Sequence, residues 1–128
     1  MRILMVSDVC FPRVNGVSTS IQTFRQDLIG LGHACRLIAP QYLQAPHIAD
    51  DSDIARISSW QVPRDPEDRA FNWSEFMRST SQLRPEDVDV VHIQTPFLAH
   101  YAGVRVARRL GAPIVETYHT YFEHYSLS

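Results

Sequence analysis

Residues 2–39 read RILMVSDVCFPRVNGVSTSIQTFRQDLIGLGHACRLIA, and this stretch decides the fold. Its first part, residues 2–7, is an apolar run rich in branched side chains, which is typical of a strand buried on both faces. Apolar residues then recur at steps of four, three, four and three, which predicts a helix with one apolar face. These positions are Val17, Ile21, Phe24, Leu28 and Leu31. Gly32 ends the helix and residues 33–39 form a second strand, so the segment predicts a right-handed parallel strand–helix–strand unit.

The remainder of the chain continues this alternation. Strands are predicted at residues 54–58, 88–93 and 113–118, and the stretch from 60 to 83 is interpreted as a loop followed by a short helix. A helix beginning at Pro96 is expected to point five side chains inward: Phe97, Tyr101, Val104, Ala107 and Leu110. The fold class is therefore α/β, a Rossmann-like, doubly wound parallel sheet with the expected strand order 3-2-1-4-5.

Composition narrows the classes of protein that the chain can belong to. With 128 residues and 45% hydrophobic content, it holds one core of ordinary size. No apolar run approaches the roughly 20 residues of a membrane-spanning helix, so the cytosol is the expected compartment. A net charge of -2 disfavours nucleic acid as a partner. All 12 basic residues are arginine, which excludes a Schiff-base lysine and a lysine-containing phosphate loop, and the two cysteines, Cys10 and Cys35, are expected to be reduced.

In a doubly wound sheet, ligands bind beyond the carboxyl ends of the strands, near the point where the strand order reverses. One segment that should meet there is Asn15-Gly16-Val17, which opens a helix and so offers free amides and a positive dipole end to a phosphate. A tight turn with a helix cap is an equally weighted interpretation. A triple-glycine fingerprint is absent, which argues against a nicotinamide dinucleotide.

The other expected wall of the site follows the last strands. His92 and His119 should end neighbouring strands, and with Cys10 they could form a metal trio, but no zinc-like spacing is present and no metal is expected. His119 is interpreted instead as a donor to an anion or a sugar hydroxyl. Its further polar contacts would be Thr120, Glu123 and Tyr125. A capping and packing cluster remains the alternative, and no Ser-His-Asp or Cys-His arrangement can be assembled for covalent hydrolysis.

Aromatic and arginine side chains between residues 60 and 84 raise the alternative of a membrane-surface contact. Four acids in the same stretch cancel its four arginines, so a helix that packs its aromatic residues on the sheet is favoured.

Several motifs together resemble the amino-terminal domain of family 4 retaining glycosyltransferases. They are MRILMVSD at 1–8, FPRVNGVS at 11–18, LGH at 31–33, DVVHIQTPF at 89–97 and YHTYFEHY at 118–125. The chain looks closest to the branch that glycosylates diacylglycerol or phosphatidylinositol, where a Pro-x-x-Asn-Gly-Val loop and a His-Thr-x-Tyr/Phe-Glu motif occur at these positions.

The resemblance implies a two-domain GT-B enzyme that transfers a hexose from a nucleotide-diphospho-sugar to a hydroxyl acceptor without a metal or other cofactor. By that analogy Gly16 and the Val17 amide approach the donor diphosphate, with Asn15 beside them. His119 is the catalytic candidate, where donor sugar and acceptor meet. The pocket around it is assigned to Thr120, Glu123, Tyr125 and His92.

The resemblance also implies that residues 1–128 form the acceptor-side domain, and that the donor-binding domain with its paired glutamates lies outside them. We therefore expect this chain alone not to transfer sugar, because the transition state needs groups from both domains. Expected partners are a nucleotide sugar, a hydroxyl acceptor such as diacylglycerol or a sugar, and the inner face of a membrane. The alternative is a non-catalytic α/β binding module or a remnant of a transferase.

Overall fold

A parallel five-stranded sheet forms the centre of the protein, in the order β3-β2-β1-β6-β7. This computed structural model describes residues 1–10, 16–42, 52–62 and 65–117. The predicted order 3-2-1-4-5 is confirmed, since β6 and β7 are the fourth and fifth strands of this sheet. The sheet strands are β1 (Arg2–Val6), β2 (Ala34–Pro40), β3 (Ile54–Ile57), β6 (Val90–Ile93) and β7 (Ile114–Glu116).

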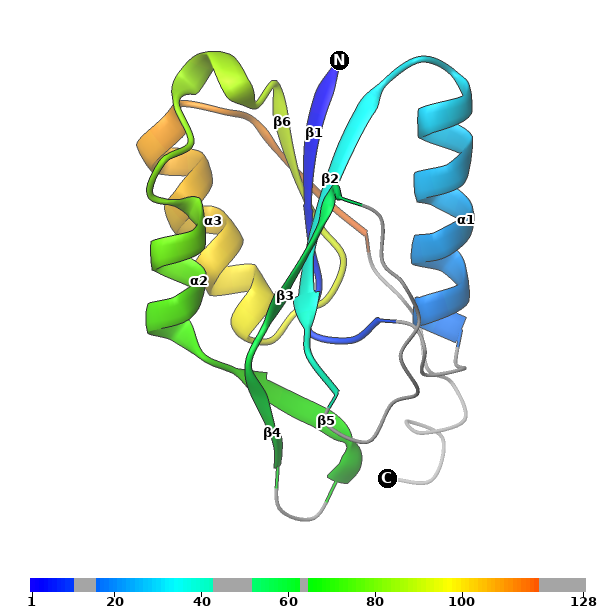
Figure 1. The fold of residues 1–128 in the computed structure, drawn as a ribbon, viewed down its shortest axis with the longest axis vertical. Helices are drawn as coiled ribbons and strands as arrows, with labels where there is room; N and C mark the ends of the chain where they lie inside the picture. Colours follow the sequence, from blue (N-terminus) through cyan, green and yellow to red (C-terminus); the bar gives the residue numbers. More distant parts are fainter. Residues whose placement is uncertain (11–15, 43–51, 63–64, 118–128) are drawn as a thin grey trace.

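Helices cover both faces of the sheet, with α1 on one side and α2 and α3 on the other (Figure 1). This arrangement gives the three-layered, doubly wound architecture that strands alternating with helices predict. The helices are α1 (Gly16–Gly30), α2 (Trp73–Thr80) and α3 (Leu98–Leu110), with a short 3-10 helix, η1 (Pro85–Asp87), before β6.

The central strand β1 divides the core into two halves, because its side chains alternate between the faces. Leu4 and Val6 belong to the cluster under α2 and α3, whereas Ile3 and Met5 belong to the cluster under α1. All four are at most 8% exposed. Burial on both faces explains why residues 2–7 form a nearly continuous apolar run.

The sequence predicted the position of α1 correctly but misplaced part of its apolar face. Phe24 is 44% exposed and Leu31, which lies beyond the end of the helix, is 75% exposed. The helix instead turns Ile21 and the buried Arg25 toward the sheet. The Arg25 Nε donates a hydrogen bond to the Cys35 carbonyl at 3.2 Å. The methylene groups of Arg25 therefore take the place of an apolar side chain in this contact, while its guanidinium is hydrogen-bonded.

The inward face of α3 was also partly mispredicted. Phe97 and Tyr101 are 51% and 64% exposed, whereas Ala107 and Leu110 are buried as expected. Small residues take the inward positions near the start of the helix: Ala99, Ala102 and Gly103. A Cβ added at Gly103 would lie 2.8 Å from Ile93 Cγ1, so α3 approaches β6 too closely for a larger side chain.

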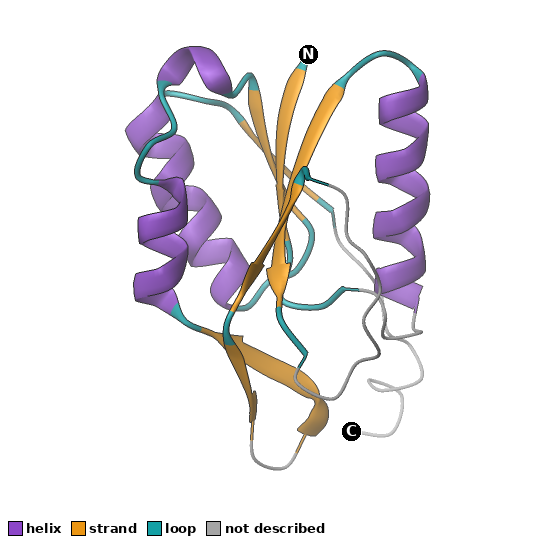
Figure 2. Cartoon of the chain, viewed as in Figure 1, coloured by secondary structure: helices purple, strands orange, loops and turns teal. Residues whose placement is uncertain are grey.

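The stretch after β3 contradicts the prediction of a loop. Residues there form an antiparallel hairpin of β4 (Ser59–Val62) and β5 (Asp65–Phe71), and the short helix α2 then follows as predicted. Figure 2 shows the hairpin beyond the carboxyl ends of β2 and β3. Pro63 and Pro66 suggested a loop because proline is rare in strands. Pro63 lies outside the described residues, and Pro66 lies in β5 of a two-stranded hairpin, where open edges tolerate a missing N–H.

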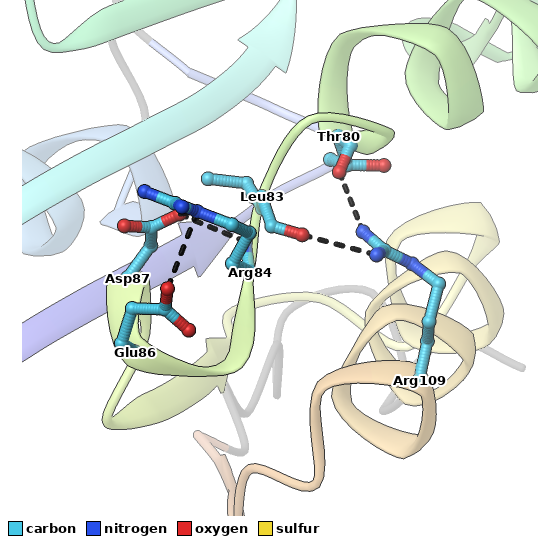
Figure 3. A network of polar contacts seen from close by, with 6 residues as sticks. All are labelled: Thr80, Leu83, Arg84, Glu86, Asp87 and Arg109. Carbon is cyan, nitrogen blue, oxygen red and sulfur yellow. Dashed lines mark hydrogen bonds and ion pairs between the residues drawn. The ribbon is translucent and has the colours of Figure 1, made fainter.

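A single arginine joins the ends of α2 and α3. Arg109 donates from Nη2 to the Thr80 carbonyl at 2.6 Å and from Nη1 to the Leu83 carbonyl at 3.0 Å (Figure 3). Carbonyls at the end of a helix lack partners within the helix, so this guanidinium satisfies groups that would otherwise depend on water. None of the helices in the described ranges is long and apolar enough to cross a membrane.

We predict that Gly103→Ala destabilises the protein, because Ile93 is fully buried and cannot move away from the added methyl group. Overpacking should lower the free energy of unfolding by about 1–3 kcal/mol, offset in part by the better helix propensity of alanine. Gly30→Ala is the matched control, since no atom lies within 4 Å of its added Cβ. Urea-induced unfolding checks this; equal midpoints for the two variants would contradict the close α3–β6 contact.

Candidate functional site

The chain leaves β1, β2, β6 and β7 at one edge of the sheet, the carboxyl edge, and α1 begins at that edge (Figure 1). Backbone hydrogen bonds continue the ladder one residue past the strand ends. The Ser7 N–H donates to the Ile38 carbonyl, the Gln94 N–H to the Val6 carbonyl and the Thr117 N–H to the Ile93 carbonyl. The strand order reverses between β1 and β6, so the crevice expected in this fold lies over the ends of these two strands.

Asp8 and Thr95 join the ends of β1 and β6 at the floor of that crevice. The Asp8 backbone N–H donates to Thr95 Oγ1 at 2.7 Å, and the Thr95 hydroxyl donates to Asp8 Oδ2 at 2.5 Å. The second carboxylate oxygen, Oδ1, accepts from the Ala99 N–H at 3.0 Å, near the start of α3. Both side chains are almost completely buried, at 2% and 3% exposed.

Two further contacts shape the chain where it leaves β1. The Ser7 hydroxyl donates to the Val9 carbonyl and accepts from the Val9 N–H, which closes a tight local turn. The Cys10 N–H donates to the Tyr42 hydroxyl at 3.0 Å, which links this turn to the end of β2. Cys10 and Cys35 are both buried, and neither is part of a disulfide.

The amino end of α1 is exposed in the described part of the chain. Gly16 is exposed, and a Cβ added there would meet no atom of the described residues within 4 Å. Val17 is only 1% exposed and packs in the core, so its side chain anchors the first turn while its backbone lies at the helix start. The first turn carries no acidic residue that would repel an anion.

His92 lies mostly below the surface of the crevice, at 8% exposed. Its Nε2 is 2.5 Å from Thr117 Oγ1, which ties β6 to β7, and its ring meets Phe24 of α1 edge-on at a centroid distance of 6.0 Å. The Gln94 amide nitrogen is 3.3 and 3.4 Å from the two ring nitrogens. These contacts fix the ring from three sides; a contact of His92 with sugar stays a prediction.

A second histidine, His100, lies at this edge without any indication from the sequence of a role there. His100 Nδ1 lies 2.6 Å from Glu116 Oε1, which joins α3 to β7. No spacing in the sequence indicates this pair, because the two residues become neighbours only when the sheet forms. The same holds for the Asp8–Thr95 pair, whose members are 87 positions apart.

The remaining predicted site residues lie outside the described residues. They are Asn15, His119, Thr120, Glu123 and Tyr125. His119 follows Thr117, the last described residue, by two positions in the sequence. Within the described part of the chain, no group of three metal-ligating side chains is present.

A hollow with a volume of about 410 Å³ lies at the other end of the sheet, lined by residues such as Arg2, Arg36 and Asp87. Two of its charged residues pair with residues beside it, Arg2 with Asp89 and Asp87 with Arg84 (Figure 3 shows the second pair). Because strand topology and the start of α1 both favour the carboxyl edge, we assign the candidate site there.

Comparisons with known proteins agree with this fold and its motifs. The chain is 33% identical over 98% of its length to an alpha-monoglucosyldiacylglycerol synthase of Streptococcus pneumoniae, of which it covers 28%. It is 32% identical over 98% to an enzyme of the same name from Acholeplasma laidlawii, covering 31%. It is 34% identical over 94% to a GDP-mannose-dependent alpha-mannosyltransferase of Mycobacterium tuberculosis, covering 32%. The chain thus spans about a third of the length of these relatives.

The family model of Glycosyltransferase Family 4 matches residues 14–128, which is most of the chain. This range begins immediately before the α1 start and includes both predicted walls of the site. The chain belongs to Glycosyltransferase Family 4.

Proposed function

We propose that this chain belongs to the acceptor-side, amino-terminal domain of a retaining glycosyltransferase. The enzyme transfers a hexose from a nucleotide-diphospho-sugar to a hydroxyl group. In this reaction the bond between the anomeric carbon and the diphosphate oxygen breaks, a bond to the acceptor oxygen forms, and the hydroxyl proton passes to the leaving diphosphate. The observation that carries the proposal is the family match from residue 14 onward, combined with a helix start at Gly16 that is exposed among the described residues on the carboxyl edge.

The start of α1 supplies the chemistry that a leaving diphosphate requires. Backbone N–H groups of the first turn have no partners within the helix, and the helix dipole adds partial positive charge there. A nucleotide diphosphate gains negative charge as the sugar leaves, so donors aimed at it stabilise the transition state more than the ground state. No metal or other cofactor is part of the proposal.

The acceptor is proposed from the relatives and from one surface. Two relatives are named for diacylglycerol, which fits an acceptor presented by a membrane. The exposed side of α3 carries Phe97, Tyr101, Arg105 and Arg108, and α3 contains no acidic residue. We call these four residues the α3 stripe. Aromatic and arginine side chains on one helix face suit an anionic lipid surface, and α3 begins at the carboxyl edge beside the candidate site.

We expect Gly16→Ala to weaken donor binding about tenfold in the complete enzyme, because a methyl group would hold the diphosphate away from the first-turn amides. The free helix start has room for the methyl group, so the melting temperature should not fall. Isothermal titration calorimetry with nucleotide-diphospho-sugars measures the affinity. Unchanged donor affinity would refute the assignment of the diphosphate to α1, and absence of any binding by the unaltered enzyme would favour a non-catalytic module.

His119→Ala should lower kcat about 100-fold while leaving donor affinity within a few-fold, because the imidazole is proposed to donate a hydrogen bond where sugar and acceptor meet. Steady-state kinetics of the complete enzyme checks this. His33→Ala is the control, since His33 lies after α1 at the opposite edge of the sheet, where its Nδ1 is 3.1 Å from the Met1 amino group. Near-normal turnover of the His119 variant would remove it from the proposed site.

Reversing two charges of the α3 stripe, Arg105→Glu with Arg108→Glu, should lower binding to vesicles containing phosphatidylglycerol by at least tenfold, since each arginine near such a surface contributes about 1 kcal/mol. Binding to phosphatidylcholine vesicles should be weak for both proteins. Arg84→Glu is the control, because Arg84 is exposed but lies near the opposite edge and pairs with Glu86. Cosedimentation measures the binding; an equal loss in the control would show that the stripe has no special part.

A further inference from the structure

The amino end of α3 is capped by a residue that follows β1 and is distant from the helix in the sequence. Its own N-cap residue, Phe97, makes no side-chain capping hydrogen bond, and its first turn contains no acidic residue. The Asp8 carboxylate takes both roles, since Oδ1 accepts the Ala99 N–H and the negative charge lies at the positive end of the helix. The cap therefore comes from the end of β1, 91 positions earlier in the chain.

The same carboxylate is tied to the end of β6. Its Oδ2 accepts from the Thr95 hydroxyl, and the hydroxyl oxygen in turn accepts from the Asp8 backbone N–H. Asp8 thus contacts Thr95 through both its side chain and its backbone. A buried carboxylate is costly unless its oxygens are hydrogen-bonded, so this arrangement is specific to the residues that satisfy it.

These contacts lie where the strand order reverses. The chain that leaves Asp8 leads to the start of α1, the proposed diphosphate site, and the chain that leaves Thr95 leads to α3 and its exposed stripe. The Asp8 carboxylate therefore adds a side-chain connection between the two segments beyond the backbone pairing of β1 with β6. Neither oxygen of this carboxylate is expected to touch a substrate, since Asp8 is 2% exposed.

We propose that Asp8 is a positioning residue: through Thr95 and the Ala99 N–H, its carboxylate holds the donor-side segment after β1 and the acceptor-side segment after β6 in the alignment that sugar transfer requires. The inference rests on the proposed function and deepens it. A shift of about 1 Å in the alignment of two reactants can cost about 100-fold in rate, so a tie at this place has a large effect on transfer.

The test compares transfer to the acceptor with transfer to water in the complete enzyme. Asp8→Asn keeps an oxygen for the Ala99 N–H but places an amide donor where Thr95 donates, and removes the charge. We expect acceptor kcat/KM to fall about 100-fold, while hydrolysis of the donor falls much less, because water needs no alignment. The product ratio is the amount of glycosylated acceptor divided by the amount of free sugar that hydrolysis releases. It does not depend on the fraction of molecules that are folded, so a loss of stability alone leaves it unchanged.

Arg109→Ala is the matched control, because it removes two hydrogen bonds, to the Thr80 and Leu83 carbonyls, near the opposite edge of the sheet. It should lower the melting temperature and leave the product ratio unchanged. Should Asp8→Asn fail to fold, Thr95→Val removes both hydrogen bonds of the Thr95 hydroxyl and keeps the Asp8 contact with the Ala99 N–H. It should lower the ratio, and Thr95→Ser should restore it. In the Asp8→Asn/Thr95→Val double variant, the fold-loss in the ratio should be smaller than the product of the two single-variant losses, because both substitutions remove the same contact.

A product ratio equal to that of the Arg109 control in both the Asp8 and the Thr95→Val variants would overturn the inference and leave the proposed function intact. Failure of the unaltered enzyme to bind or turn over any nucleotide-diphospho-sugar would overturn the proposed function, and the inference with it.

Discussion

The parallel pairing of β1 with β2 on one side and with β6 on the other is the constraint on which the rest of the structure depends. It buries β1 on both faces and brings the carboxyl ends of the strands to one edge. The chain then crosses from β1 to α1 on one face, while the connection after β6 returns through α3 on the opposite face. Because β1 is followed by α1 and its neighbour β6 by α3 on the opposite face, the ends of these two strands are the place where a doubly wound sheet is expected to bind a ligand.

The floor of the crevice is polar and buried, which is unusual in so small a core. Asp8, Thr95 and Gln94 are at most 3% exposed, although each carries groups that lose hydration on burial. Their hydrogen bonds to backbone groups and to one another offset that loss and fix the directions in which the chain leaves the sheet. Most of the buried polar residues among those described therefore lie at the ends of β1 and β6, where two segments leave the sheet.

Membership in Glycosyltransferase Family 4 gives these features a chemical context, since the chain spans about a third of the length of its relatives. A helix start open to solvent on one side can bind an anion, but it cannot by itself surround a transition state. In the proposed reaction, the described residues form a rigid floor and one wall. Groups on a second wall would complete the enclosure that excludes water and strengthens these electrostatic contacts.

The sequence by itself determined the type, order and number of strands in the sheet, because apolar runs, helical spacing and glycine or proline at the boundaries are local signals. It also placed Gly16 and Val17 at a helix start, and the motifs from 89–97 and 118–125 identified the family. The tertiary structure decided the rest. Helix orientation depended on the close approach at Gly103, so Phe97 and Tyr101 face outward. The hairpin β4–β5 forms although Pro66 lies in β5. Asp8 contacts Thr95 and the start of α3, which are 87 and 91 positions away in the sequence. Such contacts depend on which strands become neighbours, and no local sequence pattern indicates that.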